Sequence, residues 1–185
     1  KDLLLHMAMS GHALKGDMHP VFERAANGGG MALGSIGAFL VLESAEHARA
    51  RGVQPIAKLA RVVSDAAGNE SKREAALNSL WSELQPALAA NGVGVLSGAS
   101  GAEPATSIEQ NFLGAIGEHP LRATGTFTGH GLQAQFPMNI GIAALLLQSG
   151  KLYPASDDIE RRVPGDAVNQ IVVTGLGRHS GEGLA

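Results

Sequence analysis

Cysteine is absent from the 185 residues. Its absence excludes disulfide bonds, thiolate metal sites and a cysteine nucleophile within this chain. Long apolar runs are missing too: the longest, residues 140–147, includes Gly141 and is far shorter than the roughly 20 residues that cross a bilayer. The N-terminal residues lack the apolar region and cleavage site of a signal peptide. We therefore expect a cytoplasmic protein that does not span a membrane.

An excess of one charge is also missing. The sequence has 14 Lys and Arg residues against 17 Asp and Glu residues, and no basic run is long enough to follow a phosphate backbone. Nucleic acid is therefore excluded as a partner. The seven histidines are scattered without the spacing of a zinc site, and there is no Gly-x-Ser-x-Gly turn for a hydrolase serine. We expect neither a metal ion nor an organic cofactor.

The hydrophobic pattern predicts alternating helices and strands. Ser44 is placed to cap one helix, and Ser71 and Glu74 have the spacing of a capping box at the next. Pro86 is expected to kink that second helix or to end it early. This order is typical of an α/β protein with helices covering a largely buried sheet. The predicted helices are residues 1–14, 44–51, 69–90, 106–116 and 137–148, and the predicted strands are residues 38–43, 55–66, 93–98, 121–127 and 169–177.

His130 is the best candidate for chemistry in the sequence. It stands between Gly129 and Gly131, ahead of a long apolar stretch that predicts a helix. Flanking glycines allow a sharp turn that exposes an imidazole, and the N-terminal N–H groups of the next helix favour a negatively charged oxygen. The residues alone leave two interpretations open: His130 is a hydrogen-bond donor to an oxyanion, or it is a packed histidine at a strand-to-helix corner.

Four segments resemble the β-ketoacyl-acyl-carrier-protein synthases. Gly125–Ala134, "GTFTGHGLQA", is similar to their Lys-Ser-x-x-Gly-His-x-x-Gly-Ala segment. Gly34–Gly52 resembles their Gly-Glu-Gly-Ala-x-x-x-Val-Leu-Glu segment and the His-Ala-x-x-Arg-Gly helix after it. Val93–Glu109 is similar to the stretch that holds their His-Gly-Thr motif, and Val172–Gly181 falls at their terminal Asn-Ser-Phe-Gly-Phe-Gly-Gly loop. The four segments occur in the order and at the spacing of that family.

The resemblance implies a thiolase-like fold, which is built from two similar α/β halves with mixed, buried sheets covered by helices. Residues 1–34 would be the end of the N-terminal synthase half and a lead-in, and residues 35–185 would be the C-terminal β-ketoacyl synthase domain. The family implies an acyl-carrier protein as partner, and a homodimer or a heterodimer with an active synthase. The nucleophilic cysteine of the family lies upstream of Lys1, so we expect this sequence to be part of a longer protein.

The catalytic positions of the family are only partly retained. Ser97 falls at the histidine of the His-Gly-Thr motif, and Gly125 falls at the lysine that precedes Gly-His. His130 keeps the second family histidine. Decarboxylation of a malonyl thioester creates an enolate oxygen that family members stabilise with two histidine N–H donors, and losing one such donor costs about 10²- to 10³-fold in rate. We therefore expect His130 to remain as an oxyanion donor in a weakened site.

The resemblance also places substrate-binding residues at Thr128, Leu176 and Gly177. Leu176 stands where the family has a phenylalanine, and Arg178 stands where it has a glycine, so the terminal loop that gates the acyl pocket is altered.

Three hypotheses for the function follow. The first is a catalytically impaired partner subunit, similar to a chain-length factor, that shapes the acyl tunnel of fatty-acid or polyketide biosynthesis. The second is an active 3-oxoacyl synthase that condenses acyl and malonyl thioesters with an upstream cysteine. The third is a noncatalytic acyl-binding or scaffolding module.

Overall fold

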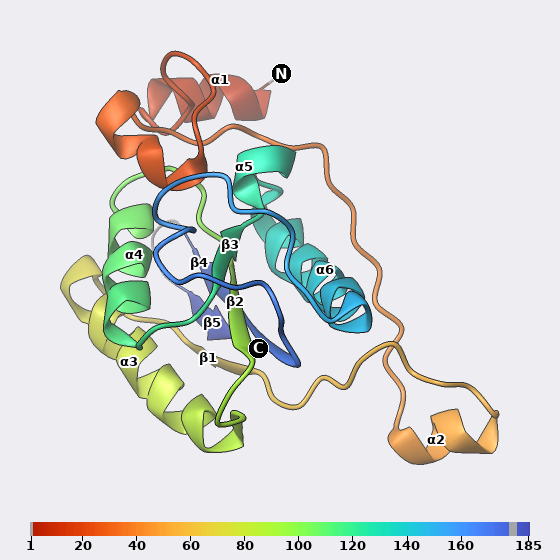
Figure 1. Cartoon of the computed structure of the whole chain (residues 1–185). Helices are drawn as coiled ribbons and strands as arrows, with labels where there is room; N and C mark the ends of the chain where they lie inside the picture. Colours follow the sequence, from red (N-terminus) through yellow and green to blue (C-terminus); the bar gives the residue numbers. More distant parts are fainter. Residues whose placement is uncertain (1, 178–180) are drawn as a thin grey trace.

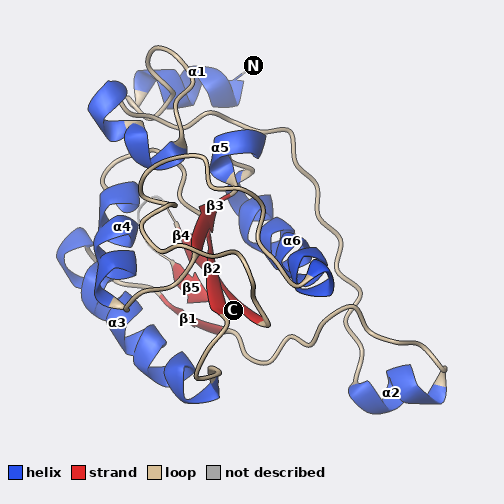
Figure 2. Ribbon diagram, in the orientation of Figure 1, coloured by secondary structure: helices blue, strands red, loops and turns tan. Residues whose placement is uncertain are grey.

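A five-stranded mixed sheet forms the centre of the computed structural model, which describes residues 2–177 and 181–185 (Figures 1 and 2). The strand order is β1–β5–β4–β2–β3, with β2 parallel to both β3 and β4, and β5 antiparallel to both β1 and β4. The strands are β1 (Val63–Asp65), β2 (Val93–Ser97), β3 (Leu121–Ala123), β4 (Gln170–Leu176) and β5 (Glu182–Leu184).

Helices cover the two faces of this sheet. Helices α3 (Arg73–Leu84) and α4 (Ala105–Ala115) lie on one side, and α6 (Gln135–Ser149) lies on the other (Figure 1). Side chains of β4 alternate between the faces, because successive residues of a strand point in opposite directions. Val172 joins Leu77 and Phe112 in the core beneath α3 and α4, whereas Val173 joins Ala143 beneath α6.

The remaining helices are short. They are α1 (Asp2–Met9), α2 (Ala45–Ala50) and α5 (Gly125–Thr128), together with 3-10 turns at Val21–Glu23, Ala25–Asn27, Glu70–Lys72, Gln85–Ala87 and Leu132–Ala134. The α/β prediction with a mixed buried sheet is confirmed. The helix cap at Ser44 is confirmed as well, since its Oγ accepts a hydrogen bond from the His47 N–H at 3.1 Å.

The predicted strand at residues 38–43 is wrong. This segment has no assigned strand and runs beside α6 toward the projecting helix α2 (Figure 1). Leu40 approaches α6, where its Cδ2 lies 3.6 Å from an ideal Cβ at Gly141, while Phe39 is 98% exposed and Val41 is 91% exposed. The continuous apolar run of a buried strand is present, but within the described residues no backbone pairs with it, and a strand needs such a partner.

Four other predicted elements are too long. Within residues 55–66 only β1 forms, and the helix expected over residues 1–14 ends at Met9. The helix expected over residues 69–90 spans only α3 between two 3-10 turns, and the capping box is wrong because Ser71 Oγ donates to Asn69 Oδ1 instead. The strand expected over residues 121–127 stops at Ala123, where the chain turns into α5.

A buried ion pair holds β5 and the end of β4 against α3. Arg73 Nε lies 2.6 Å from Glu182 Oε1, and both side chains are at most 1% exposed. Arg73 also donates a hydrogen bond to the Gly177 carbonyl, and Glu182 Oε2 accepts from the Ala67 N–H at 3.0 Å. These contacts connect α3, the end of β4 and β5 through two charges that water does not reach.

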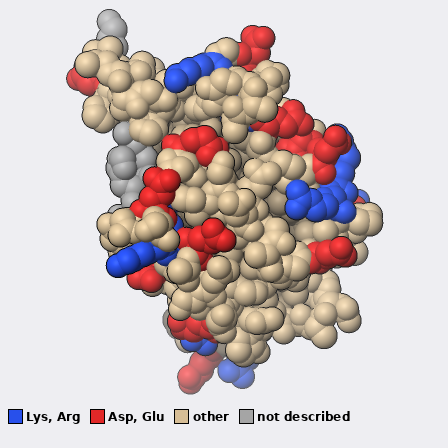
Figure 3. All heavy atoms as spheres, turned by 90° about the vertical axis from the view of Figure 1, so that its left-hand side faces the viewer, with Lys and Arg blue, Asp and Glu red and all other residues tan. Residues whose placement is uncertain are grey.

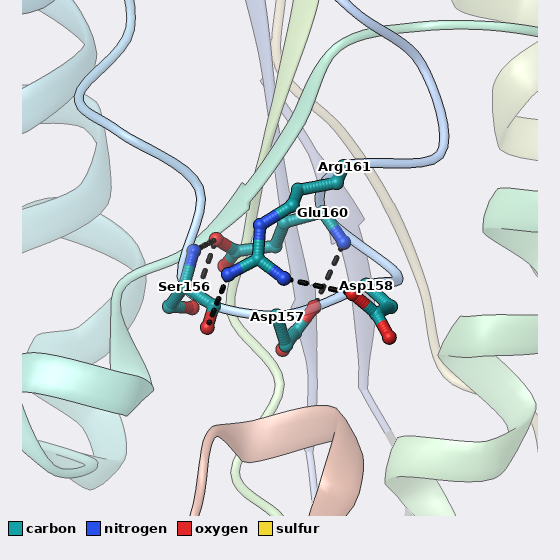
Figure 4. A network of polar contacts seen from close by, with 5 residues as sticks. All are labelled: Ser156, Asp157, Asp158, Glu160 and Arg161. Carbon is teal, nitrogen blue, oxygen red and sulfur yellow. Dashed lines mark hydrogen bonds and ion pairs between the residues drawn. The ribbon is translucent and has the colours of Figure 1, made fainter.

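A second buried carboxylate fixes the end of β3. Glu160 accepts a hydrogen bond from the Ala123 N–H at 2.7 Å. It also accepts from both the N–H and the hydroxyl of Ser156 (Figure 4). Asp157 Oδ1 in turn accepts from the Glu160 N–H at 2.8 Å. The turn around residues 156–161 therefore supports the point at which β3 gives way to α5.

The surface charges are mixed. On the side of the molecule drawn in Figure 3, basic and acidic side chains lie interspersed, and no continuous basic stripe crosses that face. None of the helices in the described part of the chain has the length and apolar character needed to cross a membrane.

Replacing Glu182 with Gln is expected to remove the carboxylate that pairs with the buried Arg73 guanidinium. Breaking a buried pair in this way costs about 3 to 5 kcal/mol. Urea denaturation of Glu182→Gln should show this loss of unfolding free energy. The exposed pair of Arg161 and Asp158, with Asp158 96% exposed, provides the control, and Asp158→Asn should be indistinguishable from wild type. Equal stability of the two variants would contradict the assignment.

Candidate functional site

A cavity of about 460 Å³ lies at the end of β4. Its lining comes from α1, the turn after β2, the loop before α6, the first turn of α6 and the β4–β5 hairpin. The lining is mainly apolar and includes Met7, Gly98, His130, Phe136, Leu176 and Glu182. Cavities of this size with a few polar groups are the usual form of small-molecule sites.

His130 reaches the cavity wall from a loop that the backbone holds firmly. Its N–H donates to the Ala32 carbonyl at 2.7 Å, and its own carbonyl accepts from the Gly34 N–H at 3.1 Å. The ring Nδ1 accepts a hydrogen bond from the Leu132 N–H at 3.2 Å. Because Nδ1 is an acceptor, the neutral ring carries its proton on Nε2.

The surroundings of His130 favour its neutral form. The residue is 9% exposed, and burial lowers the pKa of its imidazole to about 4. A hydrogen bond to the backbone of Gly98 opposes this shift, and the positive charge of Arg24 adds to it. At neutral pH, His130 is therefore an uncharged N–H donor.

A buried amide network fixes the loop that carries His130. Gln135 Oε1 accepts from the Gly131 N–H at 2.8 Å, and Gln135 Nε2 donates to Thr124 Oγ1 at 2.8 Å. Asn139, one helical turn further along α6, accepts from Thr124 Oγ1 at 2.7 Å and donates to the Ser97 carbonyl at 3.2 Å. The start of α6 is thus fastened to the ends of β2 and β3.

Ser97 belongs to a different buried group. It is 0% exposed, its Oγ donates to Glu109 Oε1 at 2.6 Å, and it does not line the cavity. Thr174 also donates to Glu109, and burial raises the pKa of this carboxyl in spite of both hydrogen bonds. The structure therefore directs the Ser97 hydroxyl toward Glu109 and away from the lining of the cavity.

Gly125 lies in a space that has no room for a side chain. An ideal Cβ there would be 2.7 Å from the Ala99 carbonyl oxygen, and such a backbone contact cannot be relieved by a rotamer change. The Gly125 carbonyl accepts from Arg24 Nη2 at 3.0 Å. Arg24 is 1% exposed and also donates to the carbonyls of His19 and Ser100. A buried guanidinium, and not a side chain at position 125, supplies the positive charge in this region.

The predicted substrate-binding residues separate into two places. Leu176 and Gly177 line the cavity together with His130. Thr128 does not line it. This residue is exposed on α5, and its hydroxyl lies within hydrogen-bonding distance of the carbonyls of Thr124 and Gly129, to either of which its one proton can be donated. Arg178 falls outside the described residues.

Several residues that shape the site were missed by sequence reasoning. Arg24, Phe136 and the ion pair of Arg73 with Glu182 gave no signal that composition or spacing could reveal. Gln135 and Asn139 did give one: they are polar residues four positions apart in a helix that is otherwise apolar until its last two residues, and this spacing places them on one face. Within residues 2–177 and 181–185, no group of three or more potential ligand side chains could hold a metal ion.

The fold is similar to that of ketosynthases. The ishigamide ketosynthase/chain length factor matches 100% of this chain with a TM-score of 0.75 and 14% identity. A β-ketoacyl synthase from Burkholderia phymatum STM815 matches 77% of it with a TM-score of 0.58 and 16% identity. A third similar structure is a type II polyketide synthase acyl-carrier protein in complex with its ketosynthase, bound to the hexaketide. It matches 77% of this chain with a TM-score of 0.56 and 18% identity.

These likenesses confirm the predicted thiolase-like α/β fold. The matched regions make up 51%, 40% and 41% of those three structures, so this chain spans about half of their length or less. No model of a protein family matches the sequence, and no curated protein matches it.

The low pKa of His130 predicts a pH-dependent stability. An unfolded histidine has a pKa near 6.5, so between about pH 6.5 and 4 the unfolded chain binds a proton that the folded chain does not. The free energy of unfolding should therefore fall by about 3 kcal/mol as the pH drops through this window. Denaturation at pH 7 and pH 4.5 should show a smaller decrease for His130→Asn than for wild type. Parallel pH profiles would contradict a buried, neutral His130.

The contact at Gly125 predicts that even the smallest side chain is poorly tolerated there. Gly125→Ala should lower the free energy of unfolding by about 1 to 3 kcal/mol, as overpacking typically does. Gly68→Ala is the control, because an ideal Cβ at Gly68 meets no atom within 4 Å. Urea denaturation of both variants measures the difference, and a stable Gly125→Ala would show that position 125 can accept a side chain.

Proposed function

We propose that this chain is a β-ketoacyl synthase-like component of fatty-acid or polyketide biosynthesis that shapes an acyl cavity and is impaired for condensation. Residues 35–185 form its C-terminal synthase domain, and residues 1–34 are the end of the N-terminal half and a lead-in. The thiolase-like fold, the mainly apolar cavity and the neutral imidazole at its wall support this assignment.

One observation carries the proposal: of the three candidate catalytic positions, His130 alone lines the cavity. The Ser97 hydroxyl is committed to Glu109, and Gly125 is packed against the Ala99 carbonyl. A synthase with two N–H donors at its enolate oxygen would need a second donor beside His130. The buried position of Ser97 makes its hydroxyl a poor substitute, which argues against an active synthase with an unusual donor pair.

The geometry of His130 suits a single step of acyl chemistry. When a malonyl thioester loses carbon dioxide, the electron pair of the breaking carbon–carbon bond moves onto the thioester carbonyl and leaves a negatively charged enolate oxygen. A neutral Nε2–H can donate to this oxygen without losing its proton. In the structure that ring is hydrogen-bonded to the backbone of Gly98, so the enolate oxygen would compete with Gly98 for the donor.

The partners follow from the same proposal. An acyl-carrier protein would deliver the thioester, as the complex of an acyl-carrier protein with its ketosynthase suggests for a similar fold. The nucleophilic thiol would come from outside residues 1–185, none of which is cysteine. Assembly as a homodimer or as a heterodimer with that synthase, and a cytoplasmic location, remain predictions.

Matched substitutions at His130 test the role of the donor. His130→Asn keeps an oxygen near Nδ1 that can accept from Leu132 but removes the Nε2–H, whereas His130→Gln places an amide N–H near Nε2. We expect decarboxylation of malonyl-acyl-carrier protein by the chain with its partner synthase to fall about 10²- to 10³-fold in His130→Asn and less in His130→Gln. Release of labelled carbon dioxide measures the rate.

Two results would contradict the proposal. If His130→Asn decarboxylates as fast as wild type, His130 is a packing residue. If Ser97→Ala loses as much activity as His130→Asn while remaining folded, Ser97 acts as the second donor and the active-synthase alternative holds. Efficient condensation of acyl and malonyl thioesters by the protein without a partner synthase would likewise rule out an impaired subunit.

A further inference from the structure

Phe136 occupies a distinctive place in the cavity wall. It lies in the first turn of α6, one residue after Gln135, whose side chain is held by the Gly131 N–H and by Thr124. The ring of Phe136 lines the cavity and packs against the core cluster beneath α6, which includes Leu96 and Val173. The ring therefore stands between the open cavity and the packed interior.

Two glycines face this ring across the cavity wall. An ideal Cβ at Gly175 of β4 would lie 2.8 Å from Phe136 Cδ2, and one at Gly183 of β5 would lie 3.7 Å from Phe136 Cζ. A side chain at position 175 and the ring in its present position cannot coexist. Phe136 therefore fills the space over bare backbone that side chains of the β4–β5 hairpin would otherwise fill.

The hydrogen bonds that hold the His130 loop also fix the position of the Phe136 ring relative to His130. Gln135 binds the backbone of the His130 loop and precedes Phe136 directly, and Asn139 anchors the next turn of α6 to the end of β2. The donor and the ring thus sit on one rigid unit at the cavity wall. Such a unit can select a ligand by its length, because the distance between the His130 imidazole and the Phe136 ring is fixed.

We propose that Phe136 sets the length of hydrocarbon chain that this cavity accepts, by closing the passage between α6 and the β4–β5 hairpin. The inference rests on the proposed function, since the ligand is an acyl thioester whose carbonyl oxygen approaches His130. Linear chains that end before the ring are bound along their whole length. Longer chains leave their terminal methylenes outside the apolar wall.

The test uses the complete chain and S-acyl-N-acetylcysteamine thioesters from butyryl to dodecanoyl. Each methylene that enters an apolar environment raises affinity about fourfold. Wild-type affinity should therefore rise with chain length and then stop rising, whereas Phe136→Ala should continue to gain about fourfold per methylene for at least two further carbons. Calorimetry gives the affinities, and the ¹⁵N signals of the His130 ring show that each probe reaches the cavity.

Three further variants make the result specific. Phe127→Ala removes a phenylalanine that is 65% exposed on α5 and outside the cavity lining, so its chain-length limit should equal that of wild type. Phe136→Leu, a milder change that preserves core packing, should extend the limit by less than Phe136→Ala. Adding Gly175→Val to Phe136→Ala puts a side chain back into the vacated space and should restore the shorter limit.

The outcomes separate this inference from the function on which it rests. If wild type binds short thioesters and all Phe136 variants keep its chain-length limit, the proposed function stands and the role of Phe136 is wrong. If no probe binds wild type or any variant at the His130 cavity, the acyl-binding function is wrong and the inference falls with it. An extended limit in Phe136→Ala that Gly175→Val reverses supports both.

Discussion

The hydrogen bonds of Gln135 and Asn139 are the contacts on which the rest of the site depends. These two buried amides lie one turn apart on α6 and connect that helix to Thr124, to the Ser97 carbonyl and to the Gly131 N–H. In a low-dielectric interior such bonds are strong, and leaving any of these groups unpaired would be costly. They determine where the His130 loop turns and where the cavity wall begins.

Only one of the three candidate catalytic positions lines the cavity, and the other two are held in the protein interior. His130 is held at a cavity as a neutral donor, while Ser97 and Gly125, which a family resemblance marks as catalytic positions, are used for packing. Arg24 binds three backbone carbonyls beside them, and its charge contributes to keeping the imidazole neutral. A site to which these residues bring a single N–H donor is suited to holding an acyl group and poorly suited to stabilising the enolate of a condensation.

Sequence patterns predicted the elements of this fold whose formation depends on residues close together in the sequence. The apolar run of β2, the Ser44 cap and the buried strand β4 each carry their own signal, and each is present. Residues 38–43 carry an equally clear strand signal, but pairing depends on a neighbouring backbone that no local pattern reveals. The candidate site divides in the same way: the glycines around His130 identified the loop, whereas the contact between Phe136 and Gly175 joins residues far apart in sequence.

The function proposed for this chain depends on His130 being an uncharged Nε2–H donor that faces an acyl-binding cavity. The most direct measurement is a long-range ¹H–¹⁵N spectrum of the His130 ring at pH 7, recorded with and without a saturating acyl thioester. We predict a neutral ring protonated on Nε2, with Nε2 shifting on ligand binding while Nδ1 stays bonded to the Leu132 N–H. A charged ring at pH 7, or an Nε2 chemical shift that does not change when the thioester binds, would contradict this role.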